Sequence, residues 1–115
     1  MNDITTLQKR IVDFRDARDW KQFHNPKDMA ISLVLEAAEV IEHFQFKSPE
    51  EIQSHLEKNK EDLSGELADV LYWVLLMAHD LDIDISKAFD NKMAQNEAKY
   101  SVEKSKGNNK KYTQL

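Results

Sequence analysis

The chain has 115 residues, which fits one domain, and its formal net charge at neutral pH is −5. The absence of Cys excludes disulfides, thiolate zinc sites and a Cys nucleophile. The acidic charge argues against a nucleic-acid partner. The sequence also lacks a signal peptide and an apolar stretch long enough to span a membrane, so we expect a cytoplasmic protein with no membrane partner.

The first half of the sequence predicts two long helices. Only 2 Gly and 2 Pro are present, which favours helices over hairpins. Apolar residues at helical spacing predict a helix over 4–20, with Asp3 as its N-cap. Asn25-Pro26 is typical of an N-cap followed by Pro at the first helical position, and predicts a second helix that runs to about Phe46.

Two further long helices and one short one are predicted after residue 47. The stretch 48–51 has the residues of a capping box and predicts a short helix that ends near Leu56. The third long helix, over 60–80, is the most apolar part of the chain, and Asp82 or Asp84 caps a fourth.

The sequence turns polar from Glu103, and Gly107 with the two Asn that follow it should end any helix there. We therefore expect a helical domain over 1–102 and a basic tail over 103–115. The composition of the tail is typical of a solvated, disordered segment. The predicted fold is all-α and resembles a four-helix bundle.

Four carboxylates are spaced so that they share helix faces. Glu36 and Glu39 lie three residues apart on the second helix, and Glu66 and Asp69 are three apart on the third. Residues at this spacing project from one side of a helix. Such a pair alone usually marks a solvated helix face.

The neighbours of these carboxylates favour a metal site instead. Both helices are apolar around most of their circumference, and such helices are normally buried. No Lys or Arg occurs in 28–46 or 61–86 to pair with the acids. Buried, unpaired carboxylates are costly unless they bind a cation, and all-oxygen ligands suit Mg²⁺, with Mn²⁺ as a substitute. A di-iron bundle is disfavoured, because no His has Glu three residues before it.

Several motifs resemble one known family. They are the two carboxylate pairs, Arg18–Pro26, Phe44-Gln45-Phe46, Glu66–Leu71 and Lys110–Leu115. Together they resemble the MazG-like, all-α nucleoside triphosphate pyrophosphohydrolases, and within them the dCTP-pyrophosphatase-like branch. The resemblance covers nearly the whole chain.

That resemblance implies a set of roles. Glu36, Glu39, Glu66 and Asp69 match the Mg²⁺ ligands of the family. Residues expected to contact the nucleotide are Trp20, His24, Phe46, Trp73, Lys92, Asn96 and the tail residues Lys110 and Lys111, with the tail closing over the triphosphate.

The chain departs from the dCTP-specific pattern at positions that touch base selection or loop shape. Members of that branch carry Trp, Tyr and His where this chain has Phe46, Trp73 and Ile11, and Pro at Ser101. None of these changes affects a proposed metal ligand. Pyrophosphohydrolase chemistry is therefore better supported than a preference for cytosine.

The expected reaction converts an NTP or dNTP and water into a monophosphate and pyrophosphate, as in the removal of unwanted nucleotides from the pool. Glu39 is the predicted general base. Apolar helix faces also predict a homodimer or a homotetramer. The alternative is a catalytically silent helical oligomerisation module, in which the acids meet lysines of a neighbouring subunit. For the hydrolase we expect Glu66→Ala to abolish activity without loss of stability in metal-free buffer.

Overall fold

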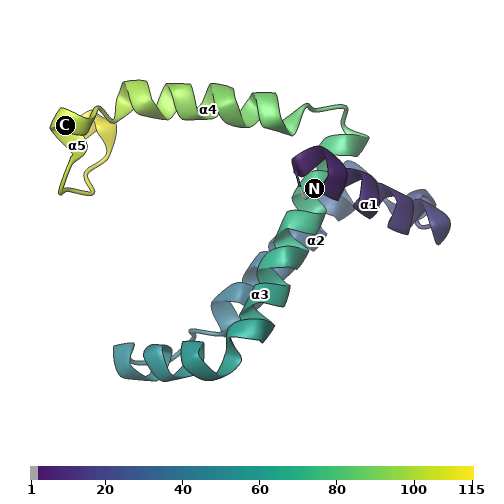
Figure 1. Cartoon of the computed structure of the whole chain (residues 1–115), viewed down its shortest axis with the longest axis horizontal. Coiled ribbons are helices and arrows are strands. Elements are labelled where there is room, and N and C mark those ends of the chain that lie inside the picture. The colour runs from purple at the N-terminus through teal and green to yellow at the C-terminus, as the bar shows by residue number, and fades with distance from the viewer. Residues whose placement is uncertain (1–2) are drawn as a thin grey trace. The chain divides into compact units, whose positions relative to one another are not determined.

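The computed structural model describes residues 3–115, and this part of the chain is helical with no strand (Figure 1). The predicted all-α class is therefore confirmed. The elements are α1 Ile4–Ala17, the 3₁₀ turn η1 Lys21–Phe23, α2 Pro26–Glu42, α3 Pro49–Asp80, α4 Ile85–Lys99, α5 Val102–Ser105 and the 3₁₀ turn η2 Tyr112–Gln114.

The chain divides into two compact units. The first extends to Asp82 and contains α1, η1, α2 and α3, and the second, Ile83–Leu115, contains α4, α5 and η2. None of the helices between residues 3 and 115 combines the length and hydrophobicity needed to cross a bilayer.

The predicted N-caps are confirmed at all four long helices. The side chains of Asp3, Asn25 and Ser48 accept hydrogen bonds from backbone N–H groups in the first turns of α1, α2 and α3. Ser48 and Glu51 form the complete capping box. Asp84, rather than Asp82, caps α4 by accepting from the Lys87 N–H at 3.1 Å. Short polar side chains thus fix where each helix begins.

The predicted short helix after residue 48 and the third long helix are one element. α3 runs for 32 residues and bends at Asn59, where φ is −126° and ψ is 25°. The Asn59 amide donates to the His55 carbonyl oxygen at 3.2 Å, which satisfies a backbone acceptor at the bend. The chain therefore kinks there without leaving the helix.

The first two long helices end earlier than predicted, α1 at Ala17 and α2 at Glu42. After α2 the chain turns, and Phe46 adopts φ +62° with 95% of its surface exposed. Such left-handed residues after helices are usually Gly or Asn. The sequence therefore carried no ordinary stop signal at this position.

α3 packs against both α1 and α2 (Figure 1). Among the described residues, the buried apolar side chains are Met29 on α2 and Leu75, Leu76 and Ala78 on α3. Many other large apolar side chains of α2 and α3 are exposed, among them Ile31, Val34, Leu35, Ile41, Leu67 and Leu71. The expectation that both helices are enclosed is thus wrong for the single chain, because α1 and the α2–α3 contact cover only part of each helix.

A buried ion pair fixes α1 to the end of α3. The Arg15 side chain has no exposed surface, and its Nη1 donates to Asp80 Oδ2 at 2.5 Å. Burial alone would raise the pKa of Asp80, but hydrogen bonds from Arg15 and His79 and their positive charges bring it below its ordinary value. The Gln8 amide adds a bond to the Leu75 carbonyl at 2.8 Å. These polar contacts determine where α1 lies along α3.

The second unit ends in a folded tail rather than an unstructured one. Gly107 has φ +81° and follows α5, as its sequence predicts. The Tyr112 ring lies 6.0 Å from that of Tyr100, and Lys99 Nζ lies 4.9 Å from the Tyr112 centroid. The tail thus folds back onto the end of α4.

Asp80→Asn should lower the free energy of unfolding by about 3 kcal/mol, because it leaves the Arg15 guanidinium buried without its main partner. Asp13→Asn is the matched control, since it breaks an exposed pair with Lys9 worth no more than about 0.5 kcal/mol. Urea unfolding measures both. Equal losses from the two variants would show that the buried pair does not fix α1.

Candidate active site

Three of the four predicted ligands converge between α2 and α3. One carboxylate oxygen from each of Glu36, Glu39 and Asp69 lies within 4.8 Å of the other two. The three-residue spacing places both glutamates on one side of α2, and the packing of α2 on α3 brings Asp69 to that side. The spacing in the sequence thus predicts which carboxylates share a helix face, and the contact between α2 and α3 brings them into one cluster.

The electrostatics of this cluster disfavour negative charge. The pKa of Glu36 is raised above its ordinary value by burial, and then by the charges of Glu39, Asp69 and Glu66 and a hydrogen bond with Glu39. A cation between the carboxylates would reverse this penalty. The donor set is all oxygen, which fits a hard divalent ion such as Mg²⁺ or Mn²⁺.

Glu66 is not part of this three-carboxylate group. Its Oε2 faces the ring nitrogen Nε2 of His43 in a very short contact, and that oxygen is shielded from solvent. The partner of Glu66 is thus a His at the end of α2, rather than a Lys or Arg. Glu66→Ala would leave His43 without its partner, so we no longer expect this variant to keep its stability.

The cluster is more open than the sequence suggests. Glu39 and Asp69 are exposed in the single chain, whereas Glu36 and Glu66 are half-buried. The expectation of four deeply buried carboxylates is therefore wrong for one chain. The reason is the uncovered apolar surface of α2 and α3 described above. Convergence, rather than burial, is what supports cation binding here.

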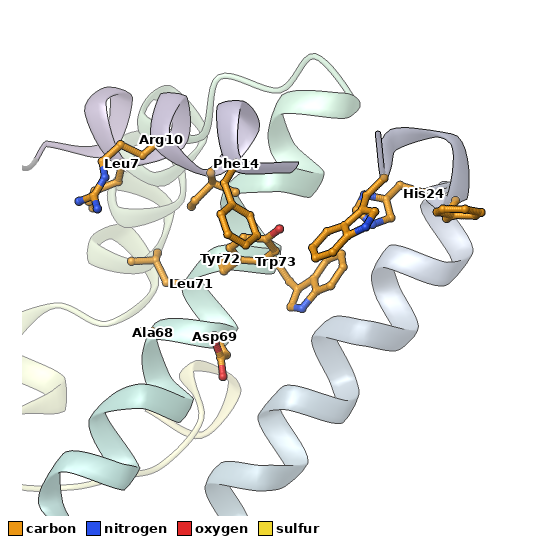
Figure 2. A pocket seen from close by; sticks show the side chains of 12 residues that line it. Leu7, Arg10, Phe14, His24, Ala68, Asp69, Leu71, Tyr72 and Trp73 are labelled. Atoms are coloured by element: carbon orange, nitrogen blue, oxygen red, sulfur yellow. The ribbon is translucent and has the colours of Figure 1, made fainter. Parts of the chain in front are cut away.

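An open pocket of about 860 Å³ adjoins the cluster and shares Asp69 with it. Figure 2 shows Asp69 about one helical turn from Trp73 on α3, with Phe14 and Tyr72 beside Trp73. The lining residues are Leu7, Arg10, Ile11, Phe14, Trp20, Phe23, His24, Ala68, Asp69, Leu71, Tyr72 and Trp73. The pocket is thus mainly apolar, with an acidic edge.

Aromatic rings form the wall of the pocket. The Tyr72 and Trp73 centroids are 5.2 Å apart and those of Phe14 and Trp20 are 5.7 Å apart, both edge to face. His24 meets Trp73 in the same manner at 5.3 Å. Flat faces of this kind suit a planar heterocycle such as a nucleobase.

His24 is held by the buried ion pair. Its Nδ1 lies 3.5 Å from Arg15 Nη1, and because Arg can only donate, Nδ1 accepts and Nε2 carries the proton. Burial, followed by the charge of Arg15, lowers the pKa of His24, with Asp80 acting in the opposite direction. A neutral ring suits a residue that contacts a substrate rather than one that exchanges protons with it.

The residues predicted to contact the nucleotide do not all lie in this pocket. Trp20, His24 and Trp73 line the pocket, where their contact with a nucleotide stays a prediction, and Phe46 does not line it. Lys92 and Asn96 lie on α4, and Lys110 and Lys111 precede η2. These four residues belong to the second unit, so their contact with a nucleotide stays a prediction.

Sequence reasoning missed much of the pocket wall. Arg10, Phe14 and Tyr72 were not identified as pocket residues, although all three line it. Phe14 is one of the apolar residues at helical spacing in 4–20, a pattern that predicts burial but not a cavity. No local pattern marks Arg10. Such residues become visible only when α1 is placed across α3.

A sequence model of the MazG-like family matches residues 31–115, which include both carboxylate pairs. The chain belongs to the MazG-like family. This MazG-like chain is 38% identical to dCTP pyrophosphatase 1 of Rattus norvegicus over 117 aligned positions, which cover 100% of the chain and 67% of that protein. It is 33% identical to dCTP pyrophosphatase 1 of Homo sapiens, with the same coverage.

The fold has a close counterpart among solved structures. A pyrophosphatase from Archaeoglobus fulgidus superposes with a TM-score of 0.80 at 35% identity. The match covers 88% of this MazG-like chain and 94% of the other. Sequence and structure comparisons therefore point to the same family.

Neutralising one acid of the cluster should stabilise the protein when no metal is present. The pKa of Glu36 is higher in the folded protein than its ordinary value. At pH values above this raised pKa, the ionised carboxylate therefore lowers the free energy of unfolding. This loss of stability disappears as the pH falls through the raised pKa and the carboxylate gains a proton. Glu36→Gln should therefore raise the melting temperature in EDTA at about pH 7.5 and have little effect at about pH 4.

Thermal unfolding at both pH values measures this difference. Glu57→Gln, an exposed position of α3 outside the cluster, is the control and should change neither value. A Glu36→Gln variant less stable than the parent protein at about pH 7.5 would contradict the crowding of charge.

Proposed function

We propose that this MazG-like protein is a nucleoside triphosphate pyrophosphohydrolase that releases pyrophosphate and a nucleoside monophosphate. The observation that carries this proposal is the position of Asp69, which belongs both to the carboxylate cluster and to the aromatic pocket. A nucleoside in the pocket would thus have its phosphates beside the acids. The names of the relatives support the same activity.

Glu36, Glu39 and Asp69 would hold Mg²⁺, or Mn²⁺ in its place, with Glu66 completing the set that the family resemblance implies. The bound ion would supply Lewis-acid chemistry by drawing charge from phosphate oxygens and by making water more acidic. A fully ionised triphosphate could not approach these carboxylates without such neutralisation.

The protein's own side chains would bind and orient the substrate. Trp73 and Trp20 present ring faces to the base, and His24 Nε2–H can donate to a substrate oxygen or nitrogen. Glu39 would accept the proton of the attacking water, since it is exposed and adjoins the other two acids. Lys110 and Lys111 would neutralise triphosphate charge from the tail.

The substrate class that we favour is a pyrimidine dNTP related to dCTP, degraded to keep the cytoplasmic nucleotide pool clean. Relatives named dCTP pyrophosphatase support this choice. Ile11 lines the pocket. Its replacement of the His of the dCTP branch removes a hydrogen-bonding group from the wall, so the base preference need not be that of dCTP.

Hydrolysis should incorporate a water oxygen into the monophosphate, because attack at the α-phosphorus leaves pyrophosphate as the departing group. Incubation of the protein with Mg²⁺, a panel of NTPs and dNTPs, and ¹⁸O-water would test this by mass spectrometry of the products. Asp69→Asn should lower kcat/KM by at least about 100-fold, whereas Asp13→Asn on α1 should leave it unchanged.

The absence of pyrophosphate from every substrate of the panel would favour the alternative, a silent oligomerisation module. Label found in pyrophosphate rather than in the monophosphate would contradict attack at the α-phosphorus.

We also propose that the protein forms a homodimer, or a homotetramer of two dimers, through α2. Ile31, Val34 and Leu35 are between 49% and 66% exposed on this helix. Apolar surface of this extent on a helix is normally covered. A second copy of the same chain offers a surface of the same kind.

Val34→Asp should therefore shift the protein toward monomers in sedimentation velocity experiments, because it places a charge in the apolar contact. Val102→Asp is the matched control, since Val102 is 77% exposed and lies outside α2. A parent protein that sediments as a monomer would contradict this part of the proposal.

A further inference from the structure

A second polar cluster lies at the end of α2, beside the three-carboxylate group of Glu36, Glu39 and Asp69. It consists of His43, which caps α2, and of His55, Asn59 and Glu66 on α3. His43 Nδ1 lies 2.7 Å from His55 Nε2, and Asn59 Nδ2 lies 3.2 Å from His55 Nδ1. His43 Nε2 then meets Glu66 Oε2. The four side chains thus form one continuous series.

The direction of the hydrogen bonds in this series is fixed by Asn59. Its amide nitrogen also faces the His55 carbonyl oxygen at 3.2 Å, which can only accept, so the nitrogen and oxygen of the Asn59 amide are assigned without ambiguity. His55 Nδ1 must therefore accept, and Nε2 carries the proton. His55 donates that proton to His43 Nδ1, which leaves His43 Nε2 as the protonated nitrogen, and this is the atom in contact with Glu66 Oε2.

The surroundings of His55 favour an uncharged ring. The pKa of His55 is lowered by burial, and further by the positive charge of Lys47. The side chain of His43 is only 11% exposed and that of Glu66 26%. The ring of His43 is packed edge to face against that of His55, with centroids 4.9 Å apart. Neither ring can turn freely away from its hydrogen bond.

Glu66 adjoins the carboxylate cluster even though it is not one of its three members. Its charge is among those that raise the pKa of Glu36. One of its oxygens is in contact with His43, and Glu66 lies one turn before Asp69 of the cluster on α3. A carboxylate that is held by one oxygen has lost most of its rotational freedom, so its second oxygen is confined to a small region.

We infer that His43, oriented by His55 and Asn59, is a positioning residue that holds the Glu66 carboxylate for divalent-cation binding at the adjoining cluster. This inference rests on the proposed function. His43 acts through Glu66 and touches neither cation nor nucleotide. The kink of α3 is part of the same arrangement, because Asn59 lies at the bend and also forms the first hydrogen bond of the series.

The test is a titration of the protein with Mn²⁺ in the absence of nucleotide. Electron paramagnetic resonance measures the free Mn²⁺ and so gives the dissociation constant. His43→Leu removes the donor to Glu66 and should weaken Mn²⁺ binding about tenfold or more. His43→Gln keeps an N–H donor of similar reach and should weaken it by less than about threefold. Gln53→Leu, at an exposed polar residue of α3 outside the series, should not change the dissociation constant.

A purely structural role of His43 predicts a different result, because loss of stability alone leaves the affinity of the folded protein unchanged. Mn²⁺ binding by folded His43→Leu with the parent dissociation constant would overturn the inference, as would equal weakening by Leu and Gln. If His43→Leu does not fold, His55→Phe is titrated instead. It removes the bond that orients His43, so weakened binding supports the inference and unchanged binding overturns it.

The same titration separates this inference from the proposed function. A parent protein that binds no Mn²⁺ would contradict the cation site itself, and the positioning role with it. A parent protein that binds Mn²⁺, with variants that bind it equally well, would contradict the positioning role alone.

Discussion

The packing of α2 on α3 brings carboxylates together, and the repulsion between these carboxylates is the main constraint on the arrangement of the two helices. Three acidic oxygens within 4.8 Å of one another cost between about 1 and 3 kcal/mol for each pair, according to how well water screens them. No Lys or Arg within either cluster-bearing stretch offsets this cost. A cation between Glu36, Glu39 and Asp69, as we propose, would offset the cost of bringing them together. The proposed cation would thus link stability and function at one place in the fold.

α3 connects every part of the first unit to that place. Its C-terminal half contributes the buried side chains Leu75 and Leu76, the acid Asp69 and the ring of Trp73. Arg15 of α1 binds the last residue of the helix, Asp80, and also reaches His24 in the loop before α2. A change at this ion pair would therefore move the pocket wall as well as the core. Aromatic pocket and acidic cluster are both held by the position of one long helix.

The sequence predicted what depends on local patterns. The helix class, the four N-caps and the two carboxylate pairs all follow from spacings of three or four residues. It failed where long-range contacts decide. The kink at Asn59 depends on a side chain that replaces a backbone partner, and the turn after α2 contains a left-handed residue, Phe46, that is not Gly. The partner of Glu66 was missed because a His on another helix, rather than a Lys or Arg nearby, lies against it. Burial was overestimated, because periodicity predicts which faces are apolar but not whether the same chain covers them.

The central claim is that Glu36, Glu39 and Asp69 bind a divalent cation that in turn binds a triphosphate. The most direct measurement is a crystal structure with Mn²⁺ and a dNTP analogue that resists cleavage between the α- and β-phosphates, with the metal located by its anomalous scattering. The account predicts an anomalous peak within ligand distance of all three carboxylates, with phosphate oxygens on its other side and the base against Trp73. Carboxylates that point into solvent or pair with lysines of a second copy, with no peak between them, would contradict it.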